Sequence, residues 1–67
     1  MRFEAIEIEG DVYVLDNVQK LAAPFGSMLT ASETVEHLES IGEKGERLFN
    51  SFSGLRPFTR EIKLTEL

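Results

Sequence analysis

Residues 32–53 read SETVEHLESIGEKGERLFNSFS, and this segment predicts an amphipathic helix. At roughly 100° per residue, its apolar side chains fall on one stripe, and no strand period fits them. These apolar residues are Val35, Leu38, Ile41, Leu48, Phe49 and Phe52. Ser32 or Thr30 can cap the start, and Gly54 followed by Pro57 is typical of a helix end. We therefore expect one long central helix over residues 32–53.

Two glycines, Gly42 and Gly45, interrupt the apolar stripe of this helix. Each costs about 1 kcal/mol in a helix interior relative to alanine. A glycine at such a position lets another backbone come close, which leaves three interpretations. The sheet packs tightly against this point, the helix breaks into two short helices around residues 42–45, or the helix contacts its counterpart in a dimer. Gly42 and Gly45 are therefore candidate close-packing or dimer-contact residues.

Four glutamates form a line on the opposite side of the expected helix, and we call this line the acidic ridge. Its members are Glu36, Glu39, Glu43 and Glu46. At a rise of 1.5 Å per residue the ridge is about 15 Å long. Only Glu43 has a favourably spaced cation on the same helix, Arg47. The acidic ridge is either a solvated helix face or a surface that binds a basic region of a partner protein.

The segments around the helix have the composition of strands. Residues 2–9 and 12–15 are rich in β-branched and aromatic side chains and flank a turn at Gly10, which predicts a β-hairpin. In the first of these strands the apolar parity changes between Ala5 and Ile6. Either a β-bulge restores the parity, or the strand is covered on both faces. Residues 58–65 alternate between apolar and polar and predict a third, half-buried strand.

The region between the hairpin and the helix is more ambiguous. Val18, Leu21 and Ala22 have the spacing of a short helical turn, and a second strand from Val18 to Leu21 fits as well. Residues 24–27 read PFGS and predict a loop.

The expected fold is a single α+β domain over residues 1–67, in which a small ββαβ unit packs a three-stranded sheet on one long central helix. A right-handed crossover from the second strand to the last would place these two parallel and give the spatial order 2-1-3. One face of the sheet would meet the helix. The other face needs cover, which a second copy of the protein could provide.

Composition narrows the functional classes. The chain has 67 residues, 12 of them acidic and 7 basic, with a formal net charge of −5 and no cysteine. Nucleic-acid binders usually show a basic face, and anionic membranes attract basic segments, so neither partner is expected. No apolar run reaches the roughly 20 residues that span a bilayer, and the N-terminus lacks the apolar region of a signal peptide. A cytoplasmic location is expected, in a cell or in an infected host.

No arrangement of residues indicates catalysis, a metal or a cofactor. His37 is the only imidazole, and neither a nucleophile motif nor a phosphate-binding loop is present. We expect a small, acidic, non-enzymatic protein-binding module, an inhibitor or regulatory factor of the antitoxin-like or phage type. It would engage a basic surface on a partner protein through Glu36, Glu39, Glu43 and Glu46. The alternative is a structural homodimer, or a subunit of a larger assembly with no separate ligand.

Overall fold

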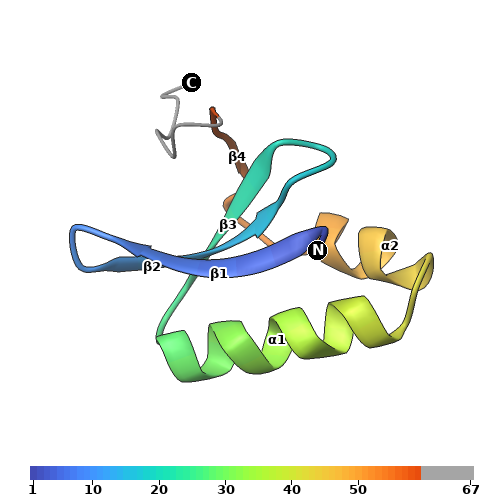
Figure 1. The fold of residues 1–67 in the computed structure, drawn as a ribbon. Helices are drawn as coiled ribbons and strands as arrows, with labels where there is room; N and C mark the ends of the chain where they lie inside the picture. The colour runs from blue at the N-terminus through green and yellow to red at the C-terminus, as the bar shows by residue number, and fades with distance from the viewer. Residues whose placement is uncertain (60–67) are drawn as a thin grey trace.

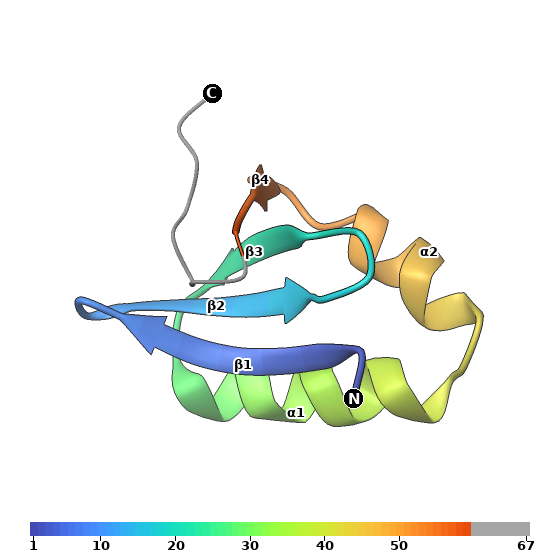
Figure 2. The same cartoon turned by 45° about the horizontal axis from the view of Figure 1, so that its top comes forward.

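In the described part of the chain, an antiparallel sheet and two helices make an α+β fold of two layers (Figure 1). The structure is a computed structural model that describes residues 1–59. The elements are β1 (Phe3–Ile8), β2 (Asp11–Asp16), β3 (Leu21–Phe25), α1 (Met28–Ser40), α2 (Lys44–Asn50) and β4 (Arg56–Pro57). The four strands follow one another as a meander in the order β1-β2-β3-β4 (Figure 2). Within residues 1–59, no helix is long and apolar enough to cross a membrane.

The expected hairpin of the first two strands is confirmed. Glu9 and Gly10 form its two-residue turn, with φ values of 51° and 88°, and positive φ at both positions gives a turn whose twist matches that of the strands. β1 and β2 pair without interruption from Phe3↔Asp16 to Ile8↔Asp11, so β1 has no bulge. The change of apolar parity in β1 therefore reflects burial on both faces of the sheet.

The two faces of the sheet carry separate apolar clusters. The cluster between the sheet and the helices contains Phe3, Val12, Val14, Ala23, Ala31, Val35, Leu38 and Phe49. The cluster on the opposite face contains Tyr13, Leu15, Ala22 and Phe58, with Ile6 and Ile8 packed against it. β2 contributes to both clusters, which is why its residues from Val12 to Asp16 are all buried.

The third strand was not predicted with its correct bounds. β3 contains Pro24 and pairs with β2 where a loop was expected. The amide of Asn17 donates to the carbonyl of Arg2 at 2.8 Å, so these two residues form a hydrogen-bonded pair of the β1–β2 ladder. In an antiparallel ladder every second pair is hydrogen-bonded, and by this count the N–H and C=O of Tyr13 point toward β1. Pro24 lies opposite Tyr13, at a position whose nitrogen faces away from β2. The missing N–H of the proline therefore costs the β2–β3 ladder no hydrogen bond.

The prediction of one helix over residues 32–53 was wrong, because the chain breaks into α1 and α2 at the glycines. Gly42 has a φ of 61°, the left-handed conformation that ends helices. α1 also begins earlier than expected, since the hydroxyl of Ser27, rather than that of Ser32 or Thr30, caps it by accepting the Thr30 amide at 3.2 Å.

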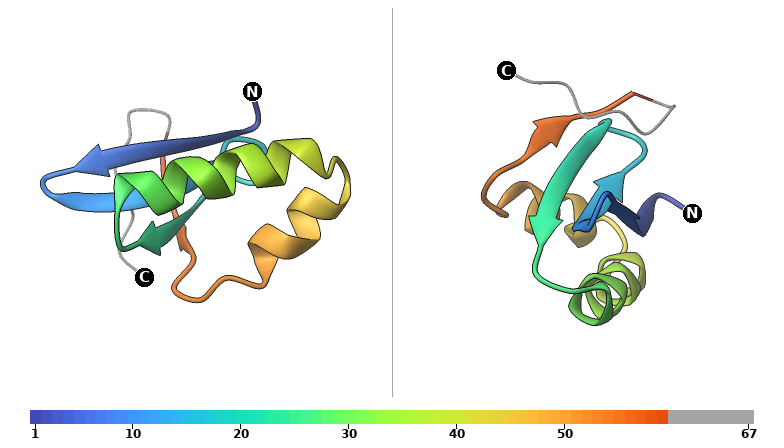
Figure 3. Two further views of the ribbon diagram at one scale, coloured as in Figure 1. Left: turned by 90° about the horizontal axis from the view of Figure 1, so that it is seen from below. Right: turned by 90° about the vertical axis from the view of Figure 1, so that its left-hand side faces the viewer.

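The expected ββαβ order is not matched, because the described residues form four antiparallel strands, three of which precede the helices. β4 is a short strand that pairs antiparallel with β3, and β1 lies at the end of the sheet rather than at its centre. Most of the strand expected at residues 58–65 lies outside the described residues. Viewed from below, α1 runs along β1 and β2, while α2 lies toward β4 (Figure 3).

Candidate functional site

The acidic ridge does not exist as one line of side chains. Glu36 and Glu39 lie on α1, Glu43 occupies the position before α2, and Glu46 lies in the first turn of α2. Because the two helices have different directions (Figure 3), the four carboxylates cannot continue a single row.

Two of these glutamates hold the fold together. Glu39 Oε2 accepts a hydrogen bond from the amide of Phe3 at 2.9 Å, and Glu46 Oε1 forms an ion pair with Arg2 Nη2 at 2.7 Å. These bonds fasten the start of β1 to both helices. Glu36 and Glu43 are exposed, and among residues 1–59 no hydrogen bond or ion pair engages either side chain. In particular, Arg47 does not pair with Glu43 in this part of the chain.

Gly45 brings the two helices into close contact. A Cβ atom at this position would lie 2.5 Å from the carbonyl oxygen of Leu38 and 3.4 Å from the ring of Phe3. Gly42 has no heavy atom within 4 Å of the corresponding position, and its role is the left-handed turn. Both glycines therefore act within the chain, one by close packing and the other by its backbone conformation.

A buried carboxylate that the sequence analysis did not single out lies at the centre of a polar cluster. Asp16 is fully buried, and it binds Arg2 through two parallel hydrogen bonds, Nε to Oδ1 at 2.9 Å and Nη2 to Oδ2 at 2.8 Å. Its Oδ1 also accepts from the amides of Val18 at 2.9 Å and Gln19 at 3.2 Å, and its Oδ2 from Gln19 Nε2 at 2.8 Å. Gln19 Nε2 in turn reaches Asn50 Oδ1 at 2.7 Å.

This cluster favours the charged forms of both partners. Burial alone would raise the pKa of Asp16, but the hydrogen bonds from Arg2, Gln19 and the two amides outweigh it and lower the pKa below its ordinary value. The same bonds to Asp16 and Glu46 raise the pKa of Arg2, whose guanidinium lies 5.2 Å from the centroid of the Phe3 ring. Because the carboxylate is fully satisfied and closed to solvent, the cluster is a structural clamp.

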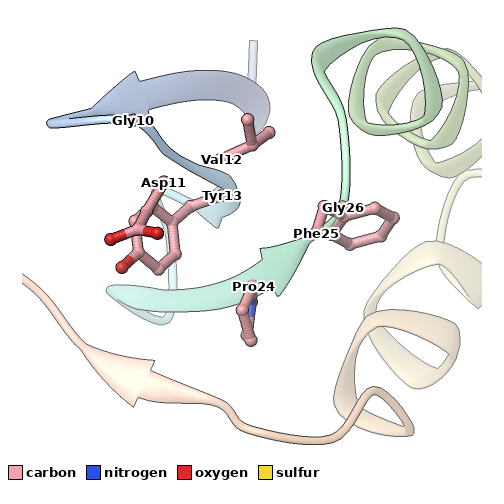
Figure 4. A pocket seen from close by; sticks show the side chains of 7 residues that line it. All are labelled: Gly10, Asp11, Val12, Tyr13, Pro24, Phe25 and Gly26. Carbon is pink, nitrogen blue, oxygen red and sulfur yellow. The ribbon is translucent and has the colours of Figure 1, made fainter.

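A depression of about 280 Å³ at the hairpin end of the sheet is the other polar feature. Its lining residues are Gly10, Asp11, Val12, Tyr13, Pro24, Phe25 and Gly26. The side chains of Asp11 and Tyr13 lie together on one side of the strands, away from Phe25 (Figure 4). The depression offers a carboxylate and a phenol, but no cation or imidazole among residues 1–59 lines it.

The described residues bring together no group of side chains that could hold a metal ion. Within residues 1–59, no three histidine, cysteine or acidic side chains come close enough to hold a metal ion. His37 is exposed near the end of α1. No family model, no curated protein and no solved structure matches the chain.

Charge is distributed unevenly over the surface. Exposed carboxylates lie on β1 and on α1, and we call this region the acidic side. Its members are Glu4, Glu7, Glu33 and Glu36, while Glu9 and Asp11 lie separately at the tip of the β1–β2 hairpin. The exposed cations lie elsewhere, with Lys20 in the β2–β3 turn and Lys44 and Arg47 on α2, which lies toward β4 (Figure 3). Among the residues described, only Arg2 forms ion pairs, and its partners are Asp16 and Glu46.

Proposed function

We propose that this protein is a small, non-enzymatic binding module whose acidic side engages a basic surface of a partner protein, as an inhibitor or regulatory factor. The separation of charge carries this proposal. The carboxylates of β1 and α1 have no cation of the described chain paired with them, and the formal net charge is −5. A partner can therefore supply the missing cations. Such complementarity raises encounter rates and selects partners by charge.

Of the four glutamates of the acidic ridge, Glu36 and Glu43 are the two that a partner can use without cost to the fold. Glu39 and Glu46 already accept bonds from Phe3 and Arg2. Reversing either of these two charges would perturb the fold as well as the surface. The binding test therefore uses Glu36→Lys together with Glu43→Lys.

The test captures partners from an extract of the source cells at low salt, with the wild-type protein and the double variant immobilised side by side. Proteins that the double variant loses are purified and their affinities are measured. A unit charge pair at about 5 Å in water contributes about 0.8 kcal/mol, so reversing two charges should weaken binding tenfold or more. The difference should shrink as salt is added.

The control variant carries Glu9→Lys and Asp11→Lys at the hairpin tip, which change the net charge by the same amount. Loss of binding only in the helix variant assigns the contact to the region of Glu36 and Glu43. Equal loss in both variants indicates attraction by net charge alone. If every captured protein binds the helix variant as tightly as the wild type, the proposal is refuted.

A further inference from the structure

The outer edge of β1 is paired with no strand in the part of the chain that the structure describes. β1 is the first strand in the order β1-β2-β3-β4, and no strand of residues 1–59 lies beyond it (Figure 3). The hydrogen bond from the Asn17 amide to the Arg2 carbonyl fixes which backbone groups face β2. In an antiparallel ladder these positions alternate. Glu4, Ile6 and Ile8 therefore face β2, while Phe3, Ala5 and Glu7 turn their N–H and C=O groups outward.

One of these outward backbone groups already has a hydrogen-bond partner. The amide of Phe3 donates to Glu39 Oε2 at 2.9 Å, so a side-chain oxygen stands where the carbonyl of another strand would otherwise lie. No residue in the described part of the chain occupies the corresponding places at Ala5 and Glu7. Within residues 1–59, the groups of this edge without a partner are therefore the N–H and C=O of these two residues and the C=O of Phe3.

We propose that an extended, basic segment of a partner protein adds to the sheet as a further strand along β1, and this inference rests on the proposed function. Backbone groups of the edge would supply the hydrogen bonds, and side chains beside the edge would supply the selection. Glu4 and Glu7 project from β1 itself. Glu36 and Glu39 line a depression of about 350 Å³ together with Met1, Ser40 and the largely buried Val35. A lining that combines apolar side chains with carboxylates suits the stem and charged head of lysine or arginine.

Charge also disfavours a second copy of the chain at this edge. Pairing β1 with another β1 would bring Glu4 and Glu7 of both copies onto adjacent strands. Like charges on neighbouring strands are destabilising, and charged side chains on edge strands are a common protection against self-pairing. The occupant that this edge favours therefore carries positive charge.

The alternation of a strand predicts the pattern of that segment. Side chains opposite Ala5 and Glu7 point toward the helix layer, where Glu36 lies, and should be basic. The side chain opposite Ile6 points to the other face, where Ile6 is half-buried, and should be apolar. Basic and apolar residues should therefore alternate along the segment.

The test uses a short acetylated and amidated peptide in which lysine and valine alternate. A matched peptide carries N-methyl groups on alternate amides, so that it keeps its charges but cannot donate hydrogen bonds to the edge. Amide hydrogen exchange is measured by NMR on the full chain with and without each peptide. We expect the unmodified peptide to bind at least tenfold more tightly and to slow exchange at Ala5 and Glu7. The amides of Glu4 and Ile6, already in the ladder, should be protected throughout.

The protein variant that matches this test is Ala5→Pro, which removes an outward N–H without changing the net charge. Because this N–H faces away from β2, the hairpin ladder should survive, and circular dichroism checks that it does. The variant should lose at least tenfold in affinity for the unmodified peptide.

Each contrary result has a distinct meaning. Equal binding of both peptides, without protection of Ala5 and Glu7, overturns strand addition and leaves the charge-based function in place. Absence of binding by either peptide also overturns strand addition, while the charge-reversal experiment decides the proposed function separately. Protection of Ala5 in the protein alone, together with a dimer in sedimentation equilibrium that Ala5→Pro dissociates, would assign the edge to a second copy and refute a basic occupant.

Discussion

Replacing Asp16 by asparagine tests the structural clamp with the smallest change of shape. The oxygen of the new side-chain amide, placed at Oδ1, can still accept from Arg2 Nε and from the amides of Val18 and Gln19. The new amino group at the Oδ2 position, however, faces Arg2 Nη2 and Gln19 Nε2, which both lie 2.8 Å away and are donors. The substitution therefore removes two hydrogen bonds and a negative charge. It also places the new amino group against the N–H groups of Arg2 and Gln19, which are donors as well.

The magnitude follows from these losses. Breaking a buried ion pair by removing one partner typically costs about 3–5 kcal/mol. The side chain of Arg2 is 26% exposed and keeps its bond to Glu46, so part of the loss is recovered through water and the second carboxylate. We expect Asp16→Asn to lower the free energy of unfolding by about 3 kcal/mol. For a domain of 67 residues, the total is only about 3–10 kcal/mol.

Urea denaturation followed by far-ultraviolet circular dichroism measures this difference, and its pH dependence gives a second check. The pKa of Asp16 is lower in the folded protein than in the unfolded chain. Its stabilisation is therefore complete above the ordinary carboxyl pKa of about 3.9 and is lost as the pH falls through the lower folded value. The gap between wild type and variant should be largest near neutral pH and should narrow in acid.

Asp11 supplies the matched control, because it is exposed in the same strand as Asp16. Asp11→Asn should change the free energy of unfolding by less than about 0.5 kcal/mol. The clamp would be refuted if Asp16→Asn were no more destabilising than Asp11→Asn. A gap that stayed constant into acid would contradict the assignment of the charge.

Two further substitutions test the turns and the helix contact by the same urea titration. Gly45→Ala should destabilise the protein by about 1–3 kcal/mol, because the new methyl group would meet the Leu38 carbonyl, although alanine has the better helix propensity. The control is Gly26→Ala, since no heavy atom lies within 4 Å of a Cβ atom at that position. Equal stability of the two variants would contradict the close contact at Gly45. Glu9→Asn should stabilise the folded protein by about 0.5–1 kcal/mol, because Glu9 has a φ of 51° and asparagine tolerates the left-handed region better than glutamate does. The control is Glu7→Asn within β1, and an equal gain in stability from it would show that the turn conformation is not the cause.

Local patterns predicted those parts of the fold that depend on neighbouring residues. The hairpin follows from two β-rich runs around Gly10, and the helical character of much of residues 32–50 follows from apolar spacing. β3 escaped prediction because its sequence, LAAPF, has no β-branched residue and contains a proline. Its strand conformation comes from pairing with β2, a tertiary contact that overrides local preference. The helix break was one of three interpretations of the glycines, and spacing alone could not select it.

The clamp could not be predicted because sequence separation hides it. Arg2 and Asp16 are 14 positions apart, and only the register of the β1–β2 hairpin brings them together. The pattern Asp16-Asn17 indicated turn chemistry, which the bonds to the Val18 and Gln19 amides do reflect. The ion pair to Arg2 left no such local signal.

The division of the glutamates into two groups changes how binding data on this protein must be interpreted. Glu39 and Glu46 look equivalent to Glu36 and Glu43 in the sequence, yet the first two hold β1 against the helices. Substituting Glu39 would release the Phe3 amide and thus lengthen the open edge of β1, so a change in binding could arise from the backbone rather than from the lost charge. Only Glu36 and Glu43 separate the two causes, because their removal alters the surface potential and leaves the hydrogen bonds of the fold intact.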